Sequence, residues 1–146
     1  MTVLAAVDRD DADSGVVQEA KRLARALETD LVVLHVINRD DFVATELQSM
    51  EERDEPIQMD EMKQHAADIA ERVGDVTDMA FESVGLVGDV PARVCDYATD
   101  IEADYVVIDG RKRTPIGKVV FSDVTQQILL NCTCPVVTVL HDKSEE

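Results

Sequence analysis

The chain has 146 residues, of which 45% are hydrophobic and only 3% aromatic, and its formal net charge is −17 at pH 7. This length predicts one domain with a substantial core over residues 1–146. The acidic balance excludes bulk nucleic-acid binding, because contacts to phosphates need a positive surface. No apolar run approaches the roughly 18 residues of a membrane span, and the N-terminus lacks the basic start of a signal peptide. We therefore expect a cytoplasmic protein.

The acidic residues are spread along the chain, aspartate outnumbers glutamate, and lysine is scarce. Self-repulsion of such a surface is tolerated where salt screens it, since the Debye length falls to about 3 Å at molar salt. The composition resembles that of proteins from salt-loving archaea, and it predicts a halophilic protein.

The first half of the chain alternates apolar strands with an amphipathic helix. Residues 2–7 are apolar and β-branched, which predicts a short buried strand that ends at Asp8. Residues 14–28 repeat apolar side chains at helical spacing. Residues 31–37 are almost continuously apolar, as in a strand buried on both faces of a parallel sheet. The acidic residues 38–57 break the pattern, and we expect a mobile crossover loop there with at most a short helical piece.

The second half continues the alternation. Helices are predicted at residues 58–73, 89–101 and 122–131. Strands are predicted at residues 77–84, 104–109 and 135–140, before an acidic tail at 141–146. Asp89 and Ser122 are suitable N-caps for the last two helices. The repeated order of strand and helix predicts an α/β fold, a parallel sheet in a three-layer α/β/α sandwich.

One stretch carries a cluster of cations. Four of the 14 Lys and Arg residues fall between Gly110 and Lys118, directly after the strand at 104–109 and before the helix that Ser122 caps. Open α/β sheets bind anions in the crevice outside the carboxyl ends of their strands, close to a helix N-terminus. The pattern therefore predicts an anion site here.

Cysteine and histidine residues give weaker signals. Cys95, Cys132 and Cys134 are expected to be buried or half-buried thiols, and the alternative is a Cys-x-Cys redox or metal pair. His35 lies within an apolar strand and is predicted to be a packed core histidine. No Ser-His-Asp arrangement or metal-ligand cluster stands out.

Several stretches resemble the universal stress protein family. They are the strand that ends in Ala6-Val7-Asp8, LHVI at 34–37, GDVPA at 88–92, ADYVVIDG at 103–110 and NCTCPVVTVL at 131–140. The resemblance runs from Met1 to Leu140. It implies a five-stranded parallel sheet of order 3-2-1-4-5, which is Rossmann-like and of the adenine nucleotide alpha hydrolase-like type. It also implies a homodimer formed partly through the last strand, residues 135–140.

The resemblance further implies a nucleotide site. Nucleotide-binding members carry Gly-x2-Gly-x9-Gly-Ser/Thr after the fourth strand, and this loop wraps the phosphates of ATP. Gly110 matches the first glycine, and Gly117 partly replaces the second. The implied ligand is ATP or AMP, alone or with Mg²⁺, with Asp8 at the ribose or the metal and the main chain of Val36 at adenine. The implied site residues are Ala6, Val7, Asp8, Val36, Asp109, Gly110, Arg111, Arg113, Gly117, Ser122, Asp123 and Val124.

Two departures from the motif favour an alternative. Arg113 stands at the second glycine, and Ser122-Asp123 stands at the closing Gly-Ser of a loop one residue shorter. The first hypothesis is a stress-response regulatory protein that binds ATP or AMP, with slow ATP hydrolysis at most and with protein partners that the sequence does not name. The alternative is a ligand-free dimeric interaction module of the same fold. An ATP pyrophosphatase and a phosphoacceptor receiver are less favoured, because the loop motif or aspartate that each needs is missing.

Overall fold

The computed structural model describes residues 1–9, 11, 14–53, 58–75, 78–110, 112–113 and 119–140. The side chains of residues 53, 112–113 and 119–120 are not described. The elements follow in the order β1 (Thr2–Ala6), α1 (Val16–Ala26), β2 (Asp30–Ile37), α2 (Arg39–Arg53), α3 (Met59–Gly74), β3 (Glu82–Val87), α4 (Val90–Asp100), β4 (Tyr105–Asp109), β5 (Lys112–Arg113), β6 (Val119–Val120), α5 (Asp123–Asn131) and β7 (Val136–Val139).

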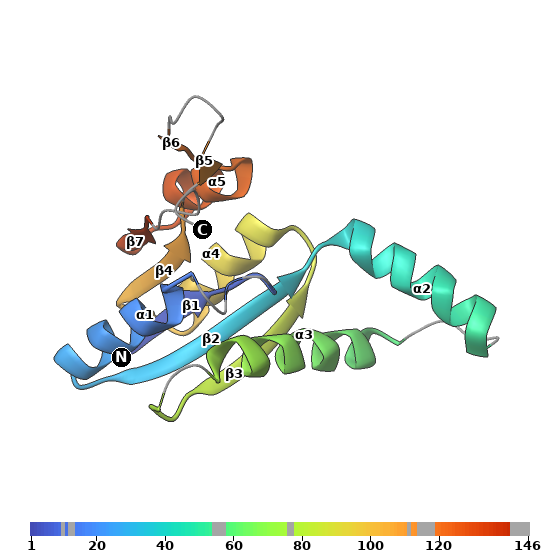
Figure 1. Ribbon diagram of the computed structural model, residues 1–146, viewed down its shortest axis with the longest axis horizontal. Helices are drawn as coiled ribbons and strands as arrows, with labels where there is room; N and C mark the ends of the chain where they lie inside the picture. The colour runs from blue at the N-terminus through green and yellow to red at the C-terminus, as the bar shows by residue number, and fades with distance from the viewer. Residues whose placement is uncertain are drawn as a thin grey trace.

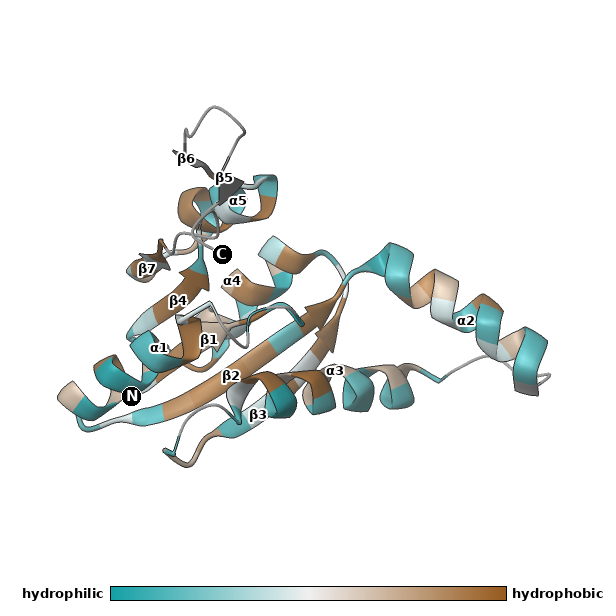
Figure 2. Cartoon of the chain, viewed as in Figure 1, coloured by the Kyte–Doolittle hydropathy of each residue, from teal (hydrophilic) through white to brown (hydrophobic). Residues whose placement is uncertain are grey.

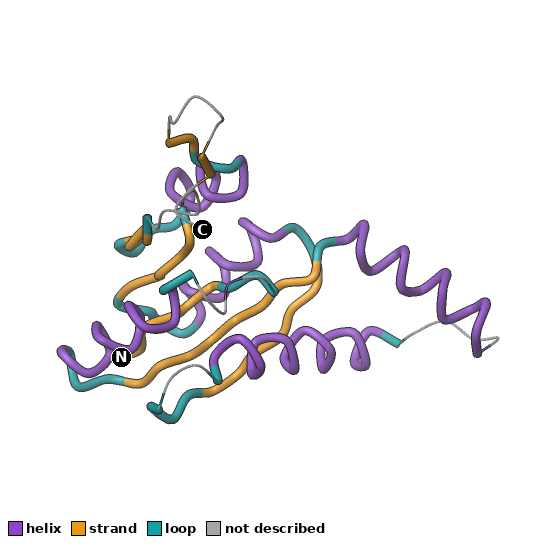
Figure 3. The backbone as a smooth tube through the Cα atoms, viewed as in Figure 1, coloured by secondary structure: helices purple, strands orange, loops and turns teal. Residues whose placement is uncertain are grey.

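Five strands form one parallel sheet in the order β3-β2-β1-β4-β7 (Figures 1 and 3). This is the order 3-2-1-4-5 when the strands of this sheet alone are counted, so the predicted α/β fold is confirmed. The strand β1 lies at the centre, with β2 on one side and β4 on the other. The carboxyl ends of β1 and β4 are therefore neighbours, and the chain order reverses between them.

The two faces of the sheet bury separate cores. Along β1, Val3 and Ala5 pack with α1 and α3, whereas Leu4 packs with α4 and α5. This alternation follows from the two-residue period of a strand. The apolar colour of β2 in Figure 2 reflects burial on both faces, since six consecutive residues from Leu31 to Val36 are all buried. The two cores fix which strand ends lie beside α4 and α5.

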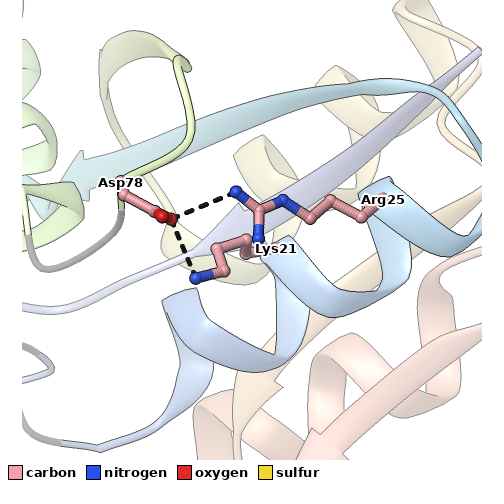
Figure 4. A network of polar contacts seen from close by, with 3 residues as sticks. All are labelled: Lys21, Arg25 and Asp78. Carbon is pink, nitrogen blue, oxygen red and sulfur yellow. Dashed lines mark hydrogen bonds and ion pairs between the residues drawn. The ribbon is translucent and has the colours of Figure 1, made fainter.

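Ion pairs join α1 to the segment before β3. Asp78 Oδ1 lies 2.9 Å from Lys21 Nζ and 3.2 Å from an Arg25 guanidinium nitrogen (Figure 4). Lys21, and to a lesser extent Arg25, lowers the pKa of the Asp78 carboxyl. Asp78 is exposed, so salt screens these pairs, and they orient the segment more than they stabilise the fold.

The expected loop at residues 38–57 is wrong, because residues 39–53 form the helix α2. Asn38 Oδ1 accepts a hydrogen bond from the Asp41 N–H at 2.8 Å, which caps the start of the helix. Residues 39–53 contain neither glycine nor proline, and Asp40 and Asp41 suit the positive end of the helix dipole. Its apolar residues remain largely exposed, and α2 projects away from the sheet layers in Figure 1. The helix therefore lacks the stripe of buried apolar residues by which a helix is predicted from the sequence.

The edge strand β3 begins later than predicted, at Glu82 rather than residue 77, and it continues through Gly85. At Gly85, α3 packs so close to β3 that a Cβ would meet the Lys63 carbonyl oxygen and the Ala67 amide nitrogen. The glycine therefore serves the packing of helix on sheet. Residue 77 of the expected strand lies outside the described part.

Cys95 and Cys132 form a disulfide between α4 and the end of α5, with their Cα atoms 4.8 Å apart. The prediction of three thiols is therefore wrong for this pair, and Cys134 is the free cysteine. The two partners lie 37 positions apart in the sequence, which hides the pairing, since only the packing of α4 against α5 brings them together. This bond links two helices that lie on the same face of the sheet.

The region after β4 differs from the expected plain loop. Lys112–Arg113 and Val119–Val120 pair as the short antiparallel strands β5 and β6. In α5, Ser122 is the N-cap as predicted, and its hydroxyl accepts from the Thr125 N–H at 3.2 Å. Thr125 and Ile128 are the buried residues of this helix, whereas Val124, Leu129 and Leu130 are exposed. Apolar side chains of α5 therefore remain outside the core.

Gly110 owes its identity to packing against β7. A Cβ at Gly110 would collide with Cγ2 of Thr138, whose strand pairs with β4. The Gly110 N–H donates to the Val139 carbonyl at 3.1 Å, which extends the sheet by one more bond. Its φ is not in the left-handed region. The close approach of β7, rather than a turn, therefore requires glycine here.

Replacing Gly110 with alanine is expected to lower the free energy of unfolding by about 1–3 kcal/mol, the usual cost of overpacking. The second change Thr138→Ser removes the colliding methyl group, so the double variant should recover part of that loss. Chemical denaturation of the two single variants and the double variant tests this. Equal stability of Gly110→Ala and the wild type would contradict the packing role.

Candidate functional site

A cavity of about 480 Å³ opens at the carboxyl edge of the sheet, beside the point where β1 and β4 end. Its volume lies within the range of about 300–1,000 Å³ that is typical of small-molecule sites. Its lining comes from β1, β2, β4, α2, α4, α5 and the residues beside them: Ala6, Val7, Asp8, Arg9, Asp11, Leu34, His35, Val36, Asn38, Asp41, Val90, Val94, Ile108, Asp109, Gly110, Ser122, Val124, Thr125 and Ile128.

The fold brings most of the predicted site residues to this cavity. Those that line it are Ala6, Val7, Asp8, Val36, Asp109, Gly110, Ser122 and Val124. Asp123 is exposed in the first turn of α5 and does not line the cavity. Arg113 belongs to β5, but its side chain is not described, and Arg111 and Gly117 lie outside the described residues. The predicted basic cluster therefore remains a prediction.

One wall of the cavity is apolar. It continues the core that α4 and α5 share with the sheet, and it consists of Leu34, Val36, Val90, Val94, Ile108 and Ile128. Sequence reasoning singled out only Val36 from this wall, because the other residues carry no signal beyond that of ordinary core positions. A flat apolar ring fits against such a surface, while polar groups at the strand ends face its edge.

The loop after β1 is organised by Asp11. Its Oδ2 accepts the backbone N–H of Asp8 at 2.7 Å, and its carbonyl oxygen accepts the Ser14 hydroxyl at 2.9 Å. Asp8 itself is exposed at the cavity, and its Oδ1 accepts the Arg9 N–H at 2.8 Å. The side chain of Asp11 thus holds the backbone at Asp8, the residue that the sequence predicts as a ligand. Nothing in the sequence distinguishes Asp11 from the other aspartates of this loop.

His35 is buried beside the same loop, as predicted. Its Nδ1 lies 2.8 Å from the Val7 carbonyl oxygen. Burial lowers the pKa of His35 below its ordinary value of 6.5, and the hydrogen bond to Val7 opposes this only in part. His35 is therefore neutral at neutral pH and fixes the end of β1 by hydrogen bonding.

Hydroxyl groups join α5 to the end of β4. The Ser122 hydroxyl donates to Thr125 Oγ1 at 3.0 Å, and the Thr125 hydroxyl donates to the Asp109 carbonyl at 3.1 Å. This chain positions the N-terminus of α5 at the cavity. The Gly110 N–H donates to the Val139 carbonyl. In this arrangement, both the Gly110 N–H and the Ser122 hydroxyl proton are therefore used within the protein and do not face a ligand.

The described lining of the cavity is acidic. Asp8, Asp11, Asp41 and Asp109 face a single described cation, Arg9. Burial, with the negative charges of Asp109 and Asp8, raises the pKa of Asp11 from 3.8 to about 6, although the hydrogen bond from the Asp8 N–H opposes the shift. Within the described residues, no three histidine, cysteine, aspartate or glutamate side chains are placed to hold a metal ion. The described side chains therefore do not fit a metal held by the protein alone.

The universal stress protein family model matches residues 1–139. The chain belongs to the universal stress protein family. No curated protein matches it. A universal stress protein from Archaeoglobus fulgidus is similar in structure, with a TM-score of 0.59, 24% identity, and coverage of 95% of this chain and 98% of the other.

Two further structures that are similar to this chain contain nucleotides. One is a universal stress protein in complex with cAMP, with a TM-score of 0.59, 20% identity, and coverage of 97% of this chain and 98% of the other. The other is a family protein from Arabidopsis thaliana with AMP bound, with a TM-score of 0.58, 15% identity, and coverage of 99% and 94%. At these identities, the likeness establishes the fold.

Within the described part of the chain, none of the helices combines the length and the apolar character that crossing a bilayer requires.

The raised pKa of Asp11 predicts a pH-dependent stability. Because this pKa is higher in the folded than in the unfolded chain, the folded state binds the proton more readily, and stability is lost as the pH rises from about 4 through 6. Asp11→Asn keeps a carbonyl acceptor for the Asp8 N–H but carries no charge. We expect this variant to be more stable than the wild type at pH 8, by on the order of 1–3 kcal/mol.

The advantage of the Asn variant should shrink as the pH falls from 6 to 4. Chemical denaturation at fixed salt and several pH values measures it. Asp96→Asn, at an exposed position on α4, is the matched control and should show no such trend. If the stabilities of the Asp11→Asn variant and the wild type differ by the same amount at every pH, the raised pKa is wrong.

Proposed function

We propose that this protein is a stress-response regulator that binds an adenine nucleotide, AMP or ATP, in the cavity at the carboxyl edge of the sheet. The observation that carries the proposal is the gathering of eight predicted site residues around one cavity of suitable volume. The AMP and cAMP complexes of proteins with this fold support the choice of ligand.

The distribution of polar and apolar groups suggests how the nucleotide lies. Adenine packs on the apolar wall beside Val36, and the exposed carboxylate of Asp8 accepts the ribose hydroxyls. The phosphates point toward the N-terminus of α5, where the helix dipole favours negative charge. There, the Ser122 hydroxyl must turn from Thr125 to donate to a phosphate. Any Mg²⁺ enters with the phosphates, because the described side chains do not form a metal site.

Titration calorimetry with AMP and ATP, with Mg²⁺, tests the proposal at moderate and at molar salt. We expect one site per chain. Asp8→Asn should weaken binding by about tenfold, since a hydrogen bond to a charged group contributes about 1.5–3 kcal/mol. Neutralising Arg111 and Arg113 together should also weaken binding, more strongly for ATP than for AMP because ATP carries more negative charge. Asp96→Asn is the control outside the cavity.

The two salt conditions also test the halophilic character suggested by the net charge of −17. A halophilic protein should melt at a higher temperature in molar than in dilute salt, because salt screens the repulsion between its carboxylates. Failure of both nucleotides to bind to the folded protein in either salt would reject the nucleotide site. That result would favour the alternative, a ligand-free dimeric interaction module.

The second part of the proposal is a homodimer through the edge strand β7. This strand pairs with β4 on one side only, and its residues are half-buried. Next to it, α5 exposes apolar side chains, of which Leu130 is 83% exposed. An edge strand flanked by an apolar patch suits pairing with a second chain.

Introducing a charge into this patch is expected to dissociate the dimer. Leu130→Asp should shift the protein toward monomers in sedimentation velocity, because the carboxylate would be buried at the contact. Leu47→Asp makes the same change at a 62% exposed site on α2 and should leave the dimer intact. A wild-type protein that sediments as a monomer at all concentrations would contradict the proposed dimer.

A further inference from the structure

Asp11 differs from the other carboxylates of the cavity in its burial, and the inference that follows rests on the proposed nucleotide function. Asp11 is only 7% exposed, whereas Asp8 and Asp41 are exposed and Asp109 is half-buried. A carboxylate shielded from water is costly to keep charged unless a cation or several hydrogen bonds compensate for the lost hydration.

The position of Asp11 is fixed by the loop around it. One carboxylate oxygen accepts the Asp8 N–H at 2.7 Å, and the Ser14 hydroxyl holds the Asp11 carbonyl at the start of α1. The side chain therefore cannot turn toward solvent without losing the bond that shapes the backbone at Asp8. The negative charge of Asp11 must therefore be neutralised inside the cavity, by a neighbouring cation or by protonation.

The groups that face this part of the cavity do not neutralise Asp11. Asp8 and Arg9 come from the same loop, Asp109 from the end of β4, His35 from β2 and Asp41 from α2. Three of these five are carboxylates. Burial lowers the pKa of His35, so its ring is neutral at neutral pH, and Arg9 is then the single described cation among these groups. The pKa of Asp11, raised to about 6 mainly by burial, fits these surroundings.

We propose that Asp11 couples nucleotide binding to the uptake of one proton, so that the cavity binds nucleotide phosphates more tightly in mildly acidic conditions. The phosphate adds negative charge to an acidic cavity, and protonation of Asp11 is the change that relieves the repulsion with the least rearrangement. The proton comes from solvent, bonds to a carboxylate oxygen of Asp11, and returns to solvent when the nucleotide leaves. A neutral Asp11 still accepts the Asp8 N–H and keeps the loop in place.

The test measures the affinity for cAMP between pH 5.5 and 8 by titration calorimetry. This probe avoids the ambiguity of AMP, whose phosphate itself titrates near pH 6, because the phosphodiester of cAMP keeps one negative charge throughout. The wild type should bind about five- to tenfold more weakly at pH 8 than at pH 5.5, as expected for one unit charge several ångströms from the phosphate. Asp11→Asn should bind with nearly constant affinity, close to that of the acidic wild type.

A matched variant and a second measurement complete the design. Asp41→Asn removes an exposed carboxylate of the same cavity and should keep the pH dependence whatever its effect on affinity. Wild-type titrations near pH 6.5 in two buffers of different ionisation enthalpy should report the uptake of a substantial fraction of one proton, even if Asp11→Asn does not fold.

The outcomes separate this inference from the proposed function. Binding of cAMP with no proton uptake, or with equal pH dependence in the wild type and Asp11→Asn, would overturn the role of Asp11 and leave the nucleotide site standing. If none of cAMP, AMP and ATP binds at any pH, the nucleotide site itself is wrong, and this inference is rejected with it.

Discussion

The reversal of chain order between β1 and β4 is the constraint on which the rest of the structure depends. The strand β1 pairs with β2 on one side and β4 on the other, so the connections leave the sheet centre in opposite directions. The loops that follow β1 and β4 therefore diverge, and a cavity opens between them. Parallel pairing places both carboxyl ends at the same edge. Asp8 and Asp109 therefore line the same cavity, although about a hundred residues separate them in the sequence.

The cavity joins two environments with opposite demands. The apolar wall is a continuation of the core between the sheet, α4 and α5, and the disulfide between Cys95 and Cys132 links those two helices. The polar rim gathers carboxylates that repel one another and would repel a phosphate. A chain with net charge −17 has much negative charge to place, yet Asp11 is shielded from water inside the site. A buried carboxylate of this kind serves the local structure, the function, or both. The hydrogen bonds of Asp11 to Asp8 and Ser14 show that it serves the local structure.

Gly110 illustrates how a motif residue can be explained in two ways. The family resemblance assigns it to the phosphate loop, whereas the structure fills the space beside it with Thr138 and engages its N–H with Val139. The glycine is thus required by the packing of β7 against β4 whether or not a nucleotide binds. A sequence motif alone cannot separate these explanations, because both require a residue without a side chain.

The sequence by itself determined the α/β class and the positions of most strands and helices, since the periodicity of buried residues is a local property. With the family resemblance, it also gave the strand order and the candidates Asp8, Val36 and Ser122. It misjudged α2, whose apolar residues remain largely exposed, and the bounds of β3, which begins at Glu82 and continues through Gly85.

Only the tertiary structure decided which aspartate is buried, which cysteines pair and why Gly110 is glycine. Each of these depends on contacts between segments distant in the chain or on shielding from water. Asp8 and Asp11 are the same residue type in one loop, and they differ in what the folded chain packs around them, since Asp8 is exposed and Asp11 is buried.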